Sequence, residues 1–232
     1  MKIFAHISWF FATLIIFIGL GISIPLFYIL PKPLGVKVSS WFIRLSIFFT
    51  TEVEGQEDPE AQLFLMNHQS DLDIIIMETT TKKDLAWVAK KELFEIPYFG
   101  LALKLPKGIA VERQSKTSII KLLKDVKDRL NMGKTITMFP EGTRSTKGKM
   151  LPFKPGAKIL ADKYKLKVQP IVIIQSAKYF NIKEFYYKPG KIKVIFLDSF
   201  TADKNDENWL KDLRDKMQKV YDDELANNPS HR

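Results

Sequence analysis

The chain has 232 residues, of which 46% are hydrophobic and 27% are charged, a composition typical of a compact globular protein. Its formal net charge of +10 favours an anionic partner, such as a lipid surface or nucleic acid. The absence of cysteine excludes disulfides, thiolate metal sites and cysteine nucleophiles. Two of the three histidines lie near the ends of the sequence, so a histidine-rich metal centre is also excluded and His68 is the one imidazole available to a folded domain.

The first element is an uncharged apolar stretch over residues 7–30, which as a helix is long enough to cross a hydrocarbon core about 30 Å thick. A signal peptide is the alternative, but its apolar region would be only about 7–15 residues long. Residues 41–49 are again apolar apart from Arg44, so a helical hairpin that enters one leaflet competes with a full span. More basic residues follow the first stretch than precede it, which favours a cytoplasmic position for the rest of the chain.

Beyond residue 60, short apolar runs alternate with amphipathic stretches. The runs predict strands over residues 62–66, 85–89, 109–112, 135–139, 168–174 and 192–197. Apolar residues at helical spacing predict helices over residues 70–79, 115–132 and from 209 to shortly before Pro229. This alternation predicts an α/β domain over residues 51–205, preceded by a membrane anchor over residues 1–50 and followed by an amphipathic helix and tail over residues 206–232.

The net basicity lies in the middle of the chain. Residues 82–158 contain 18 Lys or Arg and 7 Asp or Glu. Such a segment forms either a solvated basic face or a platform for an anionic lipid or substrate.

The first segment with chemical character is NHQSDLD, over residues 67–73, where a predicted strand gives way to a helix. In α/β folds such junctions carry ligands. If His68 lies in the loop and Asp73 in the first helical turn, the two side chains can form a dyad in which Asp73 orients the imidazole and His68 acts as a general base. The alternative is a capping box formed by Ser70 and Asp73, with His68 an ordinary loop residue.

The second such segment is FPEGTRS, over residues 139–145, which follows another predicted strand. A glycine-bearing turn with two hydroxyls and Arg144 is suited to hold a phosphate, because a guanidinium binds phosphate bidentately. The P-loop spacing is absent, and an ordinary polar turn is the alternative.

Together these segments resemble the glycerophospholipid acyltransferase family over roughly residues 60–180. Four blocks occur in the family order: NHQSDLD at 67–73, KGIAVER at 107–113, FPEGTRS at 139–145 and VQPIVI at 168–173. The first matches the H-x4-D block of the family and the third is almost literal. The second departs from the family pattern at Ala110, where a bulkier residue is expected, and at Glu112, where Asp is common.

The resemblance implies a single mixed-sheet α/β acyltransferase domain flanked by helices, with the apolar N-terminal helix as its membrane anchor. It implies that His68 and Asp73 are catalytic and that no metal or organic cofactor takes part. The residues that the resemblance assigns to the substrate phosphate are Arg144, Arg113, Glu141, Gly142 and Thr143, with Lys107 and Ser70 as further candidates.

The implied reaction moves a fatty acyl group from acyl-coenzyme A or acyl-acyl carrier protein to the sn-2 hydroxyl of lysophosphatidic acid, which gives phosphatidic acid. Another lysophospholipid, a lyso-ornithine lipid or glycerol-3-phosphate is an alternative acceptor. The implied location is the cytoplasmic membrane, on an anionic surface, with the catalytic domain facing the cytoplasm. A membrane-tethered nucleic-acid-binding module would fit the basic segment but leaves the spacing of His68 and Asp73 unexplained, so nucleic acid is not an expected partner.

Overall fold

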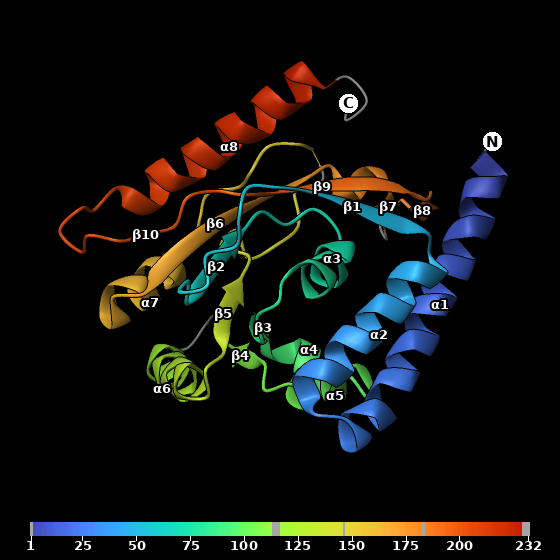
Figure 1. The fold of residues 1–232 in the computed structure, drawn as a ribbon, viewed down its shortest axis with the longest axis horizontal. Helices are drawn as coiled ribbons and strands as arrows, with labels where there is room; N and C mark the ends of the chain where they lie inside the picture. Colours follow the sequence, from blue (N-terminus) through green and yellow to red (C-terminus); the bar gives the residue numbers. More distant parts are fainter. Residues whose placement is uncertain (1, 113–116, 146, 182–183, 229–232) are drawn as a thin grey trace.

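The computed structural model describes residues 2–112, 117–145, 147–181 and 184–228 (Figure 1). The helices are α1 (Lys2–Ile29), α2 (Lys32–Ser46), α3 (Leu72–Thr80), α4 (Lys91–Glu95), α5 (Phe99–Lys104), α6 (Thr117–Asn131), α7 (Gly156–Tyr164) and α8 (Trp209–Asn227), with a short 3-10 helix at Ser176–Lys178. The strands are β1 (Phe49–Glu54), β2 (Leu63–Met66), β3 (Leu85–Lys90), β4 (Ile109–Val111), β5 (Thr135–Met138), β6 (Lys167–Ile174), β7 (Phe180–Asn181), β8 (Tyr186–Tyr187), β9 (Gly190–Phe196) and β10 (Phe200–Thr201).

The described strands form a mixed sheet in the order β1-β9-β6-β2-β5-β3-β4, with β10 paired to β6, and a separate pair of β7 and β8. The central strand β2 runs parallel to both of its neighbours, β5 and β6, whereas β6 and β9 are antiparallel. The carboxyl ends of β2, β5 and β6 therefore meet at one edge of the sheet. This arrangement confirms the predicted α/β fold with a mixed sheet, and each predicted strand and helix has a counterpart.

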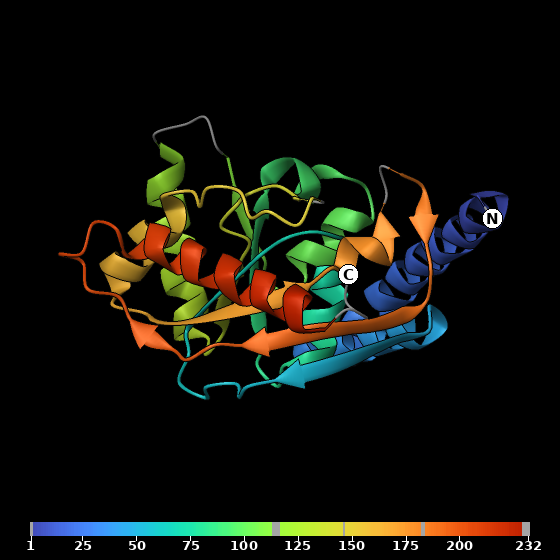
Figure 2. The same cartoon turned by 90° about the horizontal axis from the view of Figure 1, so that it is seen from above.

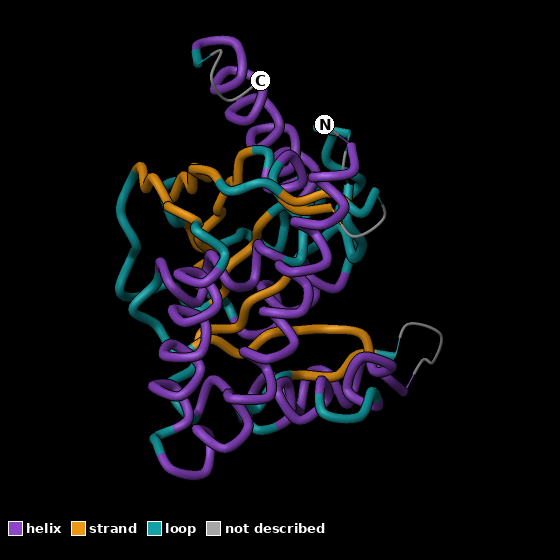
Figure 3. Tube along the Cα trace, turned by 90° about the vertical axis from the view of Figure 1, so that its right-hand side faces the viewer, coloured by secondary structure: helices purple, strands orange, loops and turns teal. Residues whose placement is uncertain are grey.

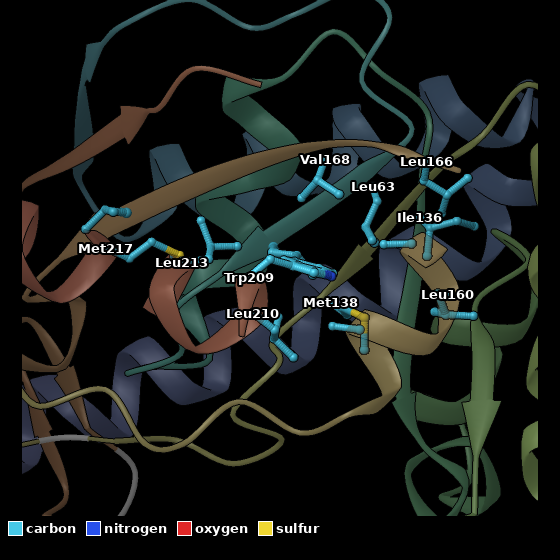
Figure 4. Packing of buried hydrophobic residues seen from close by; sticks show 14 of the residues in the cluster. Leu63, Ile136, Met138, Leu160, Leu166, Val168, Trp209, Leu210, Leu213 and Met217 are labelled. Atoms are coloured by element: carbon cyan, nitrogen blue, oxygen red, sulfur yellow. The ribbon is translucent and has the colours of Figure 1, made fainter. Parts of the chain in front are cut away.

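Successive residues of β2 point to opposite faces of the sheet, as the pleat of a strand requires. Leu63 and Leu65 join a core beneath α6, α7 and α8, and Phe64 and Met66 join a second core beneath α1, α2 and α3. Figure 2 shows α8 lying along the sheet, and Figure 4 shows its residues Trp209, Leu210, Leu213 and Met217 packed over the first core. Because all four β2 side chains are fully buried, the strand has a continuous apolar sequence.

Helices α1 and α2 form a hairpin beside the sheet (Figures 1 and 3). Residues 9–29 of α1 are the one stretch of the described chain that is long and apolar enough to cross a membrane, with a mean hydropathy of 2.4. Large apolar side chains on both helices are exposed: Phe10, Phe11, Leu14, Phe17, Ile18, Ile22, Tyr28 and Ile29 on α1, and Leu34, Val38, Trp41, Phe42 and Leu45 on α2. An exposed apolar surface of this extent is typical of a membrane-associated segment.

The second apolar stretch, expected over residues 41–49, is not a single element. Helix α2 begins earlier, at Lys32, and ends at Ser46. Phe48 then adopts a left-handed conformation with φ of 51°, and Phe49 begins β1. Strand β1 runs from Phe49 to Glu54, across the boundary that was expected after residue 50, and it pairs in parallel with β9 of the sheet.

Candidate active site

The parallel pairing of β2 and β5 brings the two chemically distinctive segments together. The first follows Met66 at the end of β2, and the second follows Met138 at the end of β5. Asn67 fixes the end of β2 to β6, because its amide donates to the carbonyl of Ile173 and accepts from the N–H of the same residue, both at 2.8 Å. The sheet therefore sets the relative position of the two loops.

His68 lies in the loop and Asp73 in the first turn of α3, as the spacing predicted. The imidazole Nδ1 is 2.9 Å from Asp73 Oδ2, and the same oxygen accepts the backbone N–H groups of Gln69 at 2.7 Å and Ser70 at 2.9 Å. Asp73 is fully buried, whereas His68 remains partly exposed. Because a carboxylate only accepts hydrogen bonds, Nδ1 carries the proton and Nε2 is left as a basic nitrogen. This arrangement can remove a proton from a hydroxyl group.

Ser70 occupies a different place from the one predicted for a helix cap. Helix α3 begins at Leu72 with Asp71 at the N-cap position, two residues later than expected. The Ser70 hydroxyl donates to the carbonyl of Phe180 at 2.7 Å and accepts the N–H of Leu72 at 3.3 Å. One half of a capping box is still present, since Asp73 accepts the N–H of Ser70. Asp73 therefore both accepts a hydrogen bond from the backbone ahead of the helix and contacts the imidazole.

An aromatic stack covers one face of the imidazole. The Phe139 ring lies parallel to the His68 ring, with 3.8 Å between centroids and 11° between planes. Trp87 on β3 lies behind Phe139, at 5.4 Å between centroids, and its Nε1 donates to Glu78 Oε1 at 2.7 Å. Burial raises the pKa of Glu78 to about 7. The stack restricts the rotation of His68, and no sequence motif predicted it.

The buried carboxylate of Glu141, in the loop after β5, holds the backbone of the His68 loop after β2. Its Oε1 accepts the backbone N–H of His68 at 2.9 Å, and its Oε2 accepts that of Leu151 at 2.7 Å. The carbonyl of His68 in turn accepts the N–H of Ser145 at 2.8 Å. Burial raises the pKa of Glu141, an effect opposed by the two N–H donors and by the nearby His68. Glu141 is almost fully buried and is directed at the backbone of His68.

Arg144 lies at the rim of the site and forms an ion pair with Asp71, at the N-cap of α3. Burial raises the pKa of Asp71, and the charge of Arg144 opposes this effect. Gly142 turns the chain with φ of +71°, a conformation that favours glycine, and its N–H donates to the Phe139 carbonyl at 2.9 Å. Thr143, beside it, is exposed. The turn therefore carries a guanidinium and an exposed hydroxyl, and it is joined to the His68 loop by the Arg144–Asp71 pair and the Ser145–His68 backbone hydrogen bond.

Of the two remaining candidate residues, Lys107 lies apart from this cluster and Arg113 is not described by the structure. Lys107 precedes β4 in a left-handed conformation with φ of +69°. The hydrogen bonds described for its backbone join it to Lys104 and Arg129, and none of them reaches the His68 loop. Arg113 lies outside the described residues.

Comparisons with known proteins show the family of the chain. A family model described as acyltransferase matches residues 50–174. The chain is 39% identical over 222 residues to the 1-acyl-sn-glycerol-3-phosphate acyltransferase of Helicobacter pylori, with 93% of each chain covered. It is 27% identical over 209 residues to the enzyme of that name from Haemophilus influenzae, covering 84% of this chain and 86% of the relative.

The fold is also similar to a solved structure. The crystal structure of the 1-acyl-sn-glycerophosphate (LPA) acyltransferase PlsC from Thermotoga maritima superposes with a TM-score of 0.73 at 21% identity, covering 98% of this chain and 97% of that one. The resemblance inferred from the four sequence blocks is thereby confirmed. The chain belongs to the acyltransferase family that includes the 1-acyl-sn-glycerol-3-phosphate acyltransferases.

Proposed function

We propose that His68 and Asp73 carry out the acyl transfer of this chain, in which the sn-2 hydroxyl of 1-acyl-glycerol-3-phosphate receives a fatty acyl group and phosphatidic acid forms. The observation that carries the proposal is the 2.9 Å contact between His68 Nδ1 and Asp73 Oδ2. The high identity to the Helicobacter pylori acyltransferase over nearly the whole chain supports the assignment of the acceptor.

The reaction proceeds by direct attack of the acceptor hydroxyl on a thioester. His68 Nε2 removes the hydroxyl proton as the oxygen bonds to the thioester carbonyl carbon, and Asp73 stabilises the imidazolium that forms. The carbon–sulfur bond then breaks, and the imidazolium returns the proton to the leaving thiolate. The stack of Phe139 on the imidazole and the Glu141 contact to the His68 backbone hold the base in place.

Arg144 binds the phosphate of the acceptor in this proposal, together with Arg113. Its guanidinium pairs with Asp71, three residues after His68, and the residue that follows it, Ser145, donates its backbone N–H to the His68 carbonyl. A phosphate offers two oxygens to the planar fork and carries more charge than one carboxylate, so it competes with Asp71 for the guanidinium. Glu141 contributes by shaping the turn.

The hairpin of α1 and α2 supports the proposed acceptor and location. Lysophosphatidic acid lies in the membrane surface, and the exposed apolar residues of α1 and α2 hold the catalytic domain beside it. The basic segment over residues 82–158 adds attraction to anionic lipids. Thioester donors, either acyl-coenzyme A or acyl-acyl carrier protein, reach the site from the cytoplasm.

An acyl-transfer assay on purified membranes tests this function. Each of the two donors is paired with lysophosphatidic acid, a neutral lysophospholipid, a lyso-ornithine lipid and glycerol-3-phosphate, and membranes without the protein serve as the control. We expect the highest kcat/KM for lysophosphatidic acid. A higher kcat/KM for an acceptor that lacks the phosphate would contradict the proposed role of Arg144.

A further inference from the structure

The C-terminal helix α8 contacts both loops of the site. Tyr221 on α8 is almost fully buried, and its hydroxyl oxygen accepts a hydrogen bond from Gln69 Nε2 at 2.9 Å. Gln69 follows His68 directly, and its backbone N–H donates to Asp73 Oδ2 at 2.7 Å. A single residue therefore connects α8 to the carboxylate that orients the imidazole. Burial raises the pKa of Tyr221, so its hydroxyl stays neutral at physiological pH.

One turn earlier on α8, Gln218 holds the segment that follows the second loop. Its Oε1 accepts the N–H of Met150 at 2.7 Å, and its Nε2 donates to the carbonyl of Gly148 at 3.1 Å. The next residue, Leu151, donates its N–H to Glu141 Oε2, and the other oxygen of Glu141 accepts the His68 N–H. Both routes from α8 thus end at His68, although α8 lies outside residues 50–174, the part that the family model matches.

We propose that Tyr221 is a positioning residue for acyl transfer, which holds Gln69 and through it the His68–Asp73 pair in the reactive geometry, with Gln218 supporting the second loop. This inference rests on the proposed function of His68. Tyr221 itself does not touch the substrate, because it is buried beneath the loop.

The variant Tyr221→Phe tests the proposal because it removes one oxygen and keeps the ring. The buried Gln69 Nε2 then loses its acceptor, and an unpaired buried donor is unfavourable enough to move the side chain. A displacement of about 1 Å can slow a reaction about 100-fold. The loss of one hydrogen bond should move the His68–Asp73 pair by less than that, so we expect kcat to fall about 10-fold. The KM values for donor and acceptor should stay within about twofold, because neither binding group has changed.

The variant Tyr164→Phe is the matched control. Tyr164 on α7 is less buried than Tyr221, but its hydroxyl is likewise hydrogen-bonded, here donating to the carbonyl of Leu123 at 2.9 Å. It loses the same oxygen in a part of the core that has no described hydrogen bond to the His68 loop. We expect its kcat to equal that of the unmodified protein, even if its melting temperature falls as much as that of Tyr221→Phe.

A double-mutant cycle separates positioning from general stability. Gln69→Met removes the same hydrogen bond from its other end, keeps a side chain of similar length and leaves the backbone hydrogen bond of Gln175 to the Tyr221 hydroxyl in place. If the Gln69 contact carries the effect, Gln69→Met also lowers kcat about 10-fold, and the double variant loses no more than the worse single variant. If Tyr221→Phe does not fold, Gln69→Met alone carries the test.

Two outcomes would overturn the proposal: a kcat for Tyr221→Phe equal to that of Tyr164→Phe, or additive losses in the cycle. His68→Ala is measured in the same assay, so that the two proposals fail separately. An inactive His68→Ala beside a fully active Tyr221→Phe overturns only the role of Tyr221. An active His68→Ala overturns the proposed function itself.

Discussion

Replacing Glu78 with Gln is predicted to stabilise the protein at alkaline pH. Glu78 on α3 is 6% exposed, and burial raises its pKa from the ordinary value of 4.5 to about 7. Between these values the folded state binds more protons than the unfolded state, so the free energy of unfolding falls as the pH rises and the loss is complete above pH 7. The difference between the two pKa values corresponds to a loss of about 3 kcal/mol. Gln carries no charge and keeps an oxygen that can accept from Trp87 Nε1.

The assay is thermal unfolding in detergent, followed by circular dichroism at pH 5 and pH 8.5. We expect Glu78→Gln to be more stable than the unmodified protein by about 3 kcal/mol at pH 8.5 and by about 1 kcal/mol at pH 5. For a chain of this length, about 3 kcal/mol raises the melting temperature by roughly 6–12 °C. The control is Glu92→Gln on α4, where the carboxylate is exposed and no gain is expected at either pH. A gain that is the same at both pH values, or a lower stability of Glu78→Gln at pH 8.5, would refute the reasoning.

Three further predictions concern the reaction and the membrane. Asp73→Asn should lower kcat about 10²–10⁴-fold, because an amide stabilises the imidazolium poorly and no longer selects the Nδ1 tautomer; steady-state kinetics measures this loss. Arg144→Lys should raise the KM for the lysophosphatidic acceptor about 10-fold and leave that for the donor nearly unchanged, since the charge remains but the planar fork is lost. Deleting residues 1–30 should release much of the protein from membranes in a sedimentation assay, because the main apolar surface is removed.

Each of these predictions has an outcome that contradicts it. An Asp73→Asn enzyme as fast as the unmodified one would reduce Asp73 to a helix-capping role. Arg214→Lys, whose arginine pairs with Asp215 on α8, is the control for Arg144→Lys and should change neither KM. A raised KM for the donor alone would place Arg144 on the thioester side of the site. Full sedimentation of the truncated protein in high salt would show that the anchor lies elsewhere.

The parts of the fold that sequence patterns predict well are those with a strong period and a buried position. The apolar runs of β2, β5 and β6 predict buried strands, and the helical stripe of α6 ends where Gly133 takes a φ of +75°. Strand β1 was not predicted, because FTTEVE is an edge strand with a largely exposed pattern and depends on pairing with β9. Helix α7 was not predicted either, since its nine residues have little periodic signal of their own.

Part of the site geometry could also be predicted from the sequence. The five-residue spacing of His68 and Asp73, with a strand before and a helix after, left two arrangements open, a dyad and a capping box, and in the structure the two side chains are in contact. The contacts of Arg144 with Asp71 and of Gln69 with Tyr221 join residues that lie 73 and 152 positions apart. No local pattern encodes such pairs, because they depend on how the parallel strands and α8 are packed.

The contacts of Glu141 and Phe139 with His68 could not be predicted without knowing that β2 pairs with β5. The signal that could have found them is their position directly after a buried parallel strand, since neighbouring parallel strands end at the same edge. The family resemblance implies that Glu141 belongs to the phosphate-binding turn, whereas in the structure its carboxylate accepts the backbone N–H of His68.

The most direct test of the central claim is the rate of acyl transfer by His68→Ala. A general base contributes about 10²–10⁴-fold, so we expect kcat/KM for lysophosphatidic acid to fall by that factor while the protein still folds and sediments with membranes. His6→Ala, on α1, is the matched histidine control and should keep the full rate. A His68→Ala protein that transfers acyl groups at a near-normal rate would contradict the account.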